Sequence, residues 1–149
     1  MNQTPTTVVI EKLRERAAAR PKVIVLPETQ DDRTLEAAGL LYSRGLVKVK
    51  LVGSESAILG RVKELGLAWG DIPVIDPRYD PNREEYVKAF FELRKHKGLT
   101  LDEATAQLND PLYYANMMVK TGKADGTVAG ATNTTAHTVR AALHCLGLK

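Results

Sequence analysis

Short apolar runs alternate along the chain with longer segments in which apolar residues recur every three or four positions. The run at 23–26 is continuously apolar and rich in β-branched residues, which is typical of a strand covered on both faces of a parallel sheet. Further strands are predicted at 47–53, 72–76 and 126–131. Because helical segments separate these runs, the order predicts an α/β fold of three layers, α/β/α, with a mostly parallel sheet and right-handed crossovers.

Capping residues mark where the helices are expected to begin and end. The expected starts are Thr4 with Pro5, Asp32, Ser54, Asn82, Thr100, Asp110 with Pro111, and Thr134, and the expected ends are Pro21, Arg44 before Gly45, about Leu65, Gly98 and about Lys120. The pairs Asn82 with Glu85 and Thr100 with Glu103 fit the capping box. Tyr86, Phe90 and Leu93 are expected to form the core stripe of their helix, and Val9, Leu13 and Ala17 share a face of the first one.

The last helix carries two faces of different chemistry. Val139, Leu143 and Leu146 are predicted to form its buried stripe, and His137, Arg140 and His144 are predicted to line a separate cationic face. From the pattern alone, Arg140 either extends its charge into water from the edge of the stripe or binds an anion.

Composition narrows the class of protein. The 149 residues fit a single α/β domain, 1–149, and their 44% hydrophobic and 26% charged content is that of a soluble globular chain. A formal charge of +3 without a basic stripe gives no reason to expect nucleic acid. The single cysteine, Cys145, and the lack of a signal peptide or long apolar segment predict a cytoplasmic protein without a membrane span.

Several chemistries lack their motifs. His137 and His144 are not spaced as a helical zinc pair, so no metal site is expected. No serine lies in a G-x-S-x-G turn, and neither a Walker A loop nor a G-x-G-x-x-G turn occurs.

In open α/β sheets, ligands bind beyond the carboxyl ends of the strands, which draws attention to 27–33 and 130–138. The second stretch joins small residues to a helix N-terminus, and its backbone amides are expected to be free for an anion such as phosphate. A plain helix cap explains Thr134 without any ligand, and the spacing alone favours the cap. In 92–98, Arg94 either complements the helix dipole or binds a phosphate group.

Three stretches in this order resemble the first half of the phosphate acetyltransferases: "VIVLPETQDDRTLEAAGLL", "ELRKHKG" and "NDPLYYANMMVKTGKADGTVAGATNTTAHTVRAAL". The resemblance implies a homodimer that transfers an acetyl group between coenzyme A and orthophosphate, with coenzyme A as substrate and with neither a metal nor a prosthetic group. It also implies that Arg94 and Arg140 hold the phosphorylated substrates and that Thr134 and Thr135 contact the phosphate or acyl phosphate. Gly130, in the turn described above, is expected to bind substrate as well.

The resemblance has limits. Thr29, His137 and Ala141 depart from the residues that the family commonly carries, namely glycine, aspartate and proline. Family members are about twice as long, and the residues credited with their chemistry lie in the second half, so no catalytic residue is assigned in this chain. We therefore expect a fragment that is inactive alone. Phosphate butyryltransferase, a non-catalytic module that binds acetyl-CoA, and a purely structural subunit remain as alternatives.

Overall fold

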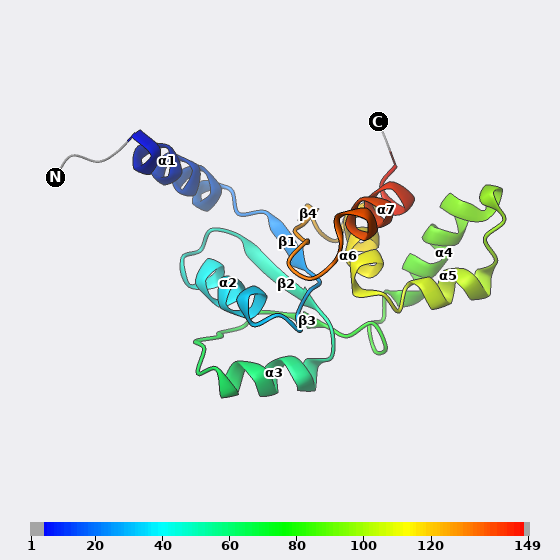
Figure 1. Ribbon diagram of the computed structural model, residues 1–149, viewed down its shortest axis with the longest axis horizontal. Helices are drawn as coiled ribbons and strands as arrows, with labels where there is room; N and C mark the ends of the chain where they lie inside the picture. Colours follow the sequence, from blue (N-terminus) through cyan, green and yellow to red (C-terminus); the bar gives the residue numbers. More distant parts are fainter. Residues whose placement is uncertain (1–4, 148–149) are drawn as a thin grey trace.

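A parallel sheet of four strands organises the computed structural model, which describes residues 5–147 (Figure 1). The strands are β1 (Val23–Leu26), β2 (Lys48–Val52), β3 (Val74–Ile75) and β4 (Gly126–Thr127), in the spatial order β3-β2-β1-β4. All three pairings are parallel. The chain therefore builds the sheet outwards from β1 in one direction and then adds β4 on the other side, as the predicted parallel α/β fold allows.

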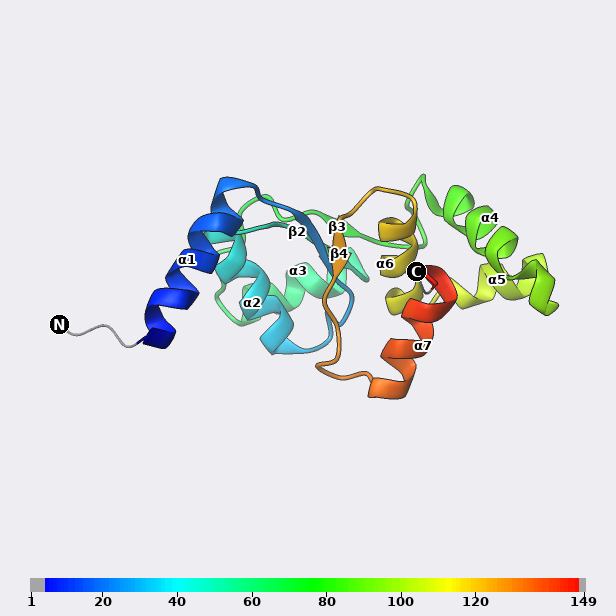
Figure 2. The same cartoon turned by 90° about the horizontal axis from the view of Figure 1, so that it is seen from above.

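Helices cover both faces of the sheet (Figure 2). One face carries α2 (Asp32–Ser43) and α3 (Glu55–Glu64), and the other carries α6 (Pro111–Lys120), on which α4 (Arg83–Arg94), α5 (Leu101–Gln107) and α7 (Thr135–Cys145) assemble. Alternating strand side chains enter the two cores: Val25 packs with the α6 side, and Leu26 with the α2 and α3 side. The predicted three layers are confirmed.

Most of the predicted helix caps are present. The Thr100 hydroxyl accepts from the Glu103 amide and the Glu103 carboxylate accepts from the Thr100 amide, which completes the predicted capping box of α5. Asp110 accepts from the amide of Leu112 at the start of α6, and Thr134 accepts from the amide of His137 in α7. The helix ends before Gly45 and Gly98 are also confirmed, since both glycines have positive φ.

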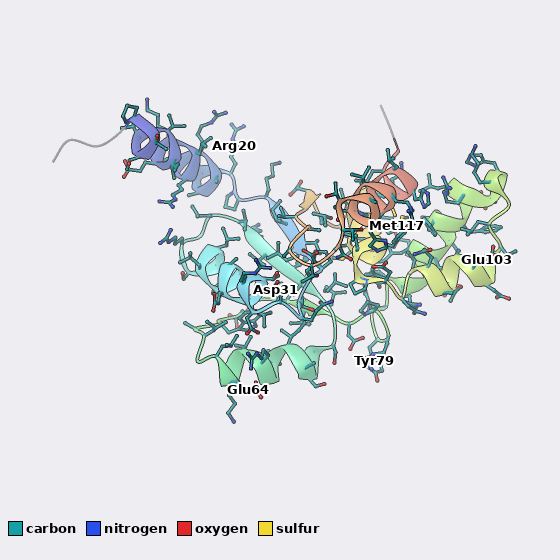
Figure 3. The ribbon with its side chains drawn as sticks, viewed as in Figure 1. Arg20, Asp31, Glu64, Tyr79, Glu103 and Met117 are labelled. Carbon is teal, nitrogen blue, oxygen red and sulfur yellow. The ribbon has the colours of Figure 1, made fainter. Side chains whose placement is uncertain are left out.

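Three predicted caps are wrong in detail. Asp31, not Asp32, caps α2 (Figure 3), because its carboxylate accepts from the amide of Arg33 while Asp32 pairs with Arg61. Asn82 has helical backbone angles and forms no capping box; its own amide donates to Asp80 instead. Ser54 makes no side-chain cap to α3.

The predicted buried stripe of α7 is wrong. Val139, Leu143 and Leu146 are 50%, 41% and 38% exposed, whereas Ala141 and Cys145 are buried. Small side chains let α7 approach α6 closely, so the helix turns its bulkier apolar face outwards. The α4 stripe is confirmed, since Tyr86 and Phe90 are buried and Leu93 is partly buried.

The first helix and the last strand also differ from expectation. The helix α1 (Pro5–Ala19) has no buried residue, with Val9 and Leu13 each 57% exposed, and its expected first residue, Thr4, lies outside the described residues. The strand β4 covers only 126–127 of the predicted 126–131. Beyond Val128, the backbone amides of this segment bond to a side chain rather than to a neighbouring strand.

Candidate functional site

The carboxyl ends of β1 and β4 meet where the strand order reverses, which is where open α/β sheets place their ligands. The loop that leaves β1 carries the stretch 27–33, and the loop that leaves β4 carries 130–138 (Figure 1). The two stretches singled out in the sequence therefore lie side by side, as the topology predicted.

A carboxylate of the first loop fills the second. Glu28 Oε2 accepts hydrogen bonds from the amides of Gly130 and Ala131 at 2.9 and 2.7 Å. Glu28 Oε1 accepts from the amides of Thr132 and Asn133 at 3.0 and 2.7 Å, and also from their side chains at 3.3 and 2.9 Å. Six donors therefore surround one carboxylate.

Burial and hydrogen bonding act in opposite directions on the pKa of Glu28. The residue is 3% exposed, and loss of water raises its pKa; the bonds from Asn133, Thr132 and Ala131 outweigh that effect and lower the pKa to about 2. Glu28 is thus a buried anion at neutral pH, stabilised by the backbone of the turn.

The expectation that the amides of this turn are free is wrong. The sequence predicted a phosphate at this turn, whereas the structure places the protein's own Glu28 carboxylate on the amides of Gly130–Asn133. Only a carboxylate placed directly after a neighbouring parallel strand could have signalled it, and "PE" at 27–28 is that feature.

The start of α7 follows directly on the filled turn. Thr134 is the N-cap residue, and both Thr134 and Thr135 are exposed. The predicted cap is therefore confirmed at Thr134. The exposed Thr135 side chain lies in the first turn of α7, at the positive end of the helix dipole.

A second positively charged region lies farther along α7. Arg140 and His144 lie on this helix, and α4, which ends at Arg94, packs against it. Burial lowers the pKa of His144, and the nearby charges of Arg94 and Arg140 lower it further. We refer to Arg94, Arg140 and His144 as the cationic cluster.

Tyr113 of α6 forms the floor of the cationic cluster. Its hydroxyl lies 3.1 Å from His144 Nδ1, and its ring contacts both His144 and His137. Burial raises the pKa of Tyr113. Within residues 5–147, no carboxylate pairs with Arg94 or Arg140, whereas Arg33, Arg61 and Arg78 each hold one.

His137 lies on the same side of α7 as His144, since the Tyr113 ring contacts both, but it is paired with a carboxylate. Its Nε2 lies 2.7 Å from Asp110 Oδ2, the same residue that caps α6 through Oδ1. The pair ties the first turn of α7 to the first turn of α6. Sequence reasoning missed it, because the two residues are separated by 27 positions and no local spacing relates them.

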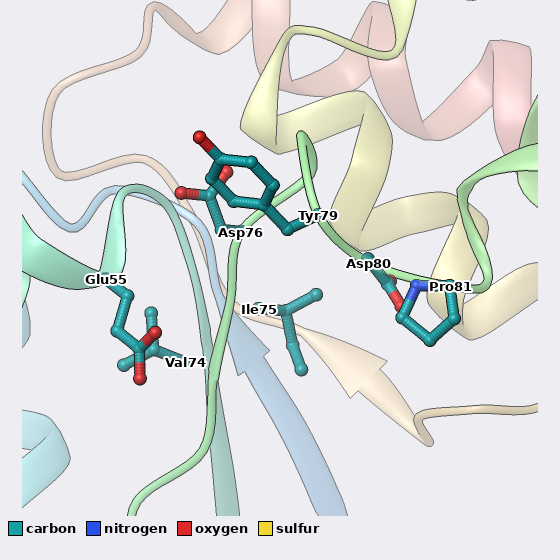
Figure 4. A pocket seen from close by; sticks show the side chains of 7 residues that line it. All are labelled: Glu55, Val74, Ile75, Asp76, Tyr79, Asp80 and Pro81. Carbon is teal, nitrogen blue, oxygen red and sulfur yellow. The ribbon is translucent and has the colours of Figure 1, made fainter.

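Another hollow, of about 250 Å³, lies at the carboxyl end of β3 and is lined by Glu55, Asp76 and Tyr79 (Figure 4). Asp76 is held by Arg78 at 2.6 Å, and Asp80, also in the lining, accepts from Tyr114. These acidic groups repel anions, so this hollow does not compete with the cationic cluster for phosphate.

Residues 5–147 contain no group of three or more His, Cys, Asp or Glu side chains that could hold a metal ion. None of the helices formed there is long and apolar enough to cross a membrane. Cys145 is buried, and burial raises the pKa of its thiol to about 12.

Comparison with known proteins gives one consistent result. The family model described as phosphate acetyl/butaryl transferase matches residues 8–149. The phosphate acetyltransferase of Acetivibrio thermocellus is 42% identical over 137 residues, which cover 92% of this chain and 41% of that protein. That of Treponema pallidum is 42% identical over 139 residues, with 93% and 41% covered.

Solved structures agree. A phosphotransacetylase from Staphylococcus aureus, EutD, superposes with a TM-score of 0.89 at 33% identity and covers 99% of this chain. The match takes up 44% of the Staphylococcus aureus chain. The chain therefore spans about two fifths of the length of these relatives.

Proposed function

Because the chain belongs to the phosphate acetyl/butaryl transferase family, we propose that it is the first domain of a phosphate acetyltransferase. The complete enzyme transfers an acetyl group reversibly between coenzyme A and orthophosphate, giving acetyl phosphate and free coenzyme A. The observation that carries this proposal is the cationic cluster. Its two arginines have no carboxylate partner among the described residues, and the chain's relatives bear that activity in their names.

The substrates are polyanions, and the cluster suits them. A guanidinium donates two parallel hydrogen bonds to a phosphate group, and no carboxylate among residues 5–147 forms an ion pair with Arg94 or Arg140. Thr134 and Thr135 add hydroxyl groups at the positive end of α7. We assign Arg94 and Arg140 to the phosphates of coenzyme A or acetyl phosphate, and the threonines to the transferred phosphate.

Two exposed surfaces support a larger protein. Among the described strands, β4 lies at the edge of the sheet and pairs with β1 alone, and α7 exposes Val139, Leu143 and Leu146. Unpaired strand edges and apolar helix faces are ordinarily covered. We assign this face to the remainder of the longer enzyme, which also supplies the groups that deprotonate the thiol and stabilise the departing phosphate.

The remaining features follow the same proposal. The enzyme is a cytoplasmic homodimer, with coenzyme A as substrate and without a prosthetic group or metal. The family includes enzymes that transfer acetyl groups and enzymes that transfer butyryl groups. The described residues contain no feature that selects between these two acyl groups.

The test compares the longer protein that contains this chain with residues 1–149 alone. We expect the longer protein to form acetyl phosphate from acetyl-CoA and phosphate, faster than it forms butyryl phosphate from butyryl-CoA. Residues 1–149 alone are expected to bind coenzyme A without turnover. Faster butyryl transfer would reassign the acyl group, and coenzyme A binding by a longer protein without turnover would favour a regulatory module.

A further inference from the structure

We propose that Glu28 is a resident anion, which fills the turn at Gly130–Asn133 in place of a phosphate and thereby positions the start of α7. The proposal rests on geometry. All four consecutive amides of the turn point at one carboxylate, at 2.7 to 3.0 Å. Such concave sets of amides are the structures that bind phosphate in other proteins.

The turn is built to converge on this carboxylate. Gly130 has a φ of +116°, in a region that L side chains rarely adopt, and this conformation brings its amide into line with the next three. The side chains of Thr132 and Asn133 donate to the same oxygen, Glu28 Oε1. A substrate phosphate would have to displace all six bonds and would meet a buried negative charge.

A second contact locks the same two loops together. Arg33 donates to the carbonyl of Ala131 at 3.2 Å and is itself held by Asp31 at 2.6 Å. The loop after β1 therefore holds the loop after β4 by two contacts: the Glu28 carboxylate bonds to the turn amides, and the Arg33 guanidinium bonds to the carbonyl of Ala131. Thr134 and Thr135 follow the gripped turn directly, so their positions depend on it.

The anion-binding groups of the chain fall into two sets. The turn amides bind Glu28, while the cationic cluster and the exposed hydroxyls stay available. The statement that Glu28 positions Thr134 and Thr135 for substrate rests on the proposed function. The statement that Glu28 occupies an anion site does not, and it can be tested without coenzyme A or acetyl phosphate.

The experiment is anion rescue of Glu28→Ala in the 149-residue chain. Amide hydrogen exchange is measured residue by residue in sodium acetate, sodium phosphate and sodium chloride at matched ionic strength. In the variant, we expect acetate and phosphate to slow exchange at 130–133 relative to chloride. When the anion is present at ten times its dissociation constant for the turn, the equilibrium constant for opening of the turn amides falls about elevenfold. In the unmodified chain, acetate and chloride should give equal exchange there.

The matched control is Glu36→Ala, which removes the same charge from an exposed position on α2 and should behave as the unmodified chain. Equal exchange of the folded Glu28→Ala variant in all three salts would overturn the proposal. Phosphate acting on the turn amides of the unmodified chain would also overturn it.

A second variant covers loss of folding. If Glu28→Ala unfolds in chloride, recovery of its structure in acetate supports the proposal. If acetate does not restore the fold of Glu28→Ala, the Glu28→Gln variant is measured instead. Its side-chain NH2 group is a donor and would face the N–H donors of the turn, which then lose an acceptor. Faster exchange confined to 130–133 in Glu28→Gln then supports the proposal, and exchange equal to that of the unmodified chain contradicts it.

Discussion

The turn at Gly130–Asn133 and the cationic cluster at Arg94, Arg140 and His144 both have the chemistry of an anion site, yet only one of them is free. In the turn, six donors are satisfied by Glu28. In the cluster, no carboxylate of residues 5–147 pairs with either arginine. A turn that resembles a phosphate-binding site can thus serve the fold alone. The charges of Arg94 and Arg140, which look like those of an ordinary solvated helix face, stay accessible to a ligand.

The two regions differ in what a protein gains from them. The turn amides are paired with the buried Glu28 carboxylate, and a hydrogen-bonding group left without a partner away from water costs about 1–3 kcal/mol. Partly exposed guanidinium groups stay hydrated and can wait for a ligand at little cost. We therefore expect changes in the turn to affect stability and changes in the cluster to affect binding.

The largest expected effect is the acid sensitivity of the turn. A carboxylate with an ordinary pKa of 4.5 and a folded pKa of about 2 contributes about 3 kcal/mol to stability above pH 4.5. Because the folded pKa is the lower one, this contribution is lost as the pH falls from 4.5 towards 2. The free energy of unfolding, measured by urea titration across this range, should fall more steeply for the unmodified chain than for Glu28→Gln. Parallel pH profiles would contradict the bonding at the turn.

Arg140→Ala tests the cluster. In the longer enzyme it should weaken substrate binding by roughly 1.5 to 3 kcal/mol, or tenfold to a hundredfold, if Arg140 bonds a phosphate group. Michaelis constants for both substrates measure the effect, with Arg16→Ala on the exposed helix α1 as the matched control. Unchanged constants for both substrates would remove Arg140 from the site.

Arg94→Ala sharpens the assignment within the cluster. We expect it to weaken the binding of coenzyme A by about 1.5 kcal/mol, roughly tenfold, and the binding of acetyl phosphate by less. The two Michaelis constants of the longer enzyme give the comparison directly. Equal effects on both substrates would show that Arg94 does not distinguish them.

His137→Ala concerns the contact between the first turns of α6 and α7, outside both regions. Loss of its bond to Asp110 should lower the free energy of unfolding by about 1 kcal/mol, since the pair is partly exposed. His96→Ala, at an exposed position after α4, is the matched control and should change stability little. A result for His137→Ala equal to this control would mean that the 2.7 Å contact contributes nothing.

The smallest expected effect lies on the outward face of α7. Leu143→Ser should change the free energy of unfolding of the 149-residue chain by less than about 0.5 kcal/mol, because Leu143 is 41% exposed. The same substitution should cost more in the longer protein, where we expect this face to be covered. Equal costs in the two proteins would show that Leu143 lies outside that contact.

Local signals in the sequence predicted most of the architecture. The apolar run at 23–26 and the caps at Thr100, Asp110 and Thr134 act over a few residues, and the structure confirms them. The buried face of α7 was predicted wrongly, because hydrophobicity alone does not show that Ala141 and Cys145 fit a close helix contact better than leucine does.

The site was less predictable for a related reason. Glu28 and the turn are separated by more than a hundred positions, so no local sequence pattern relates them. Small residues and a helix start predicted a bound phosphate at this turn, where the structure has the Glu28 carboxylate. Sequence reasoning could not tell a ligand from a side chain of the same fold, because both present the same oxygen atoms to the same amides. The assignments of Arg94, Arg140, Thr134 and Thr135 to substrate stay predictions.

The most direct test is a titration of the isotopically labelled 149-residue chain with inorganic phosphate and then coenzyme A, followed by nuclear magnetic resonance. We predict that signals of Arg94, Arg140 and the ring of His144 shift while the amides of Gly130–Asn133 keep their positions. Shifts at those amides without shifts in the cluster would contradict the division between a filled turn and a free cationic cluster.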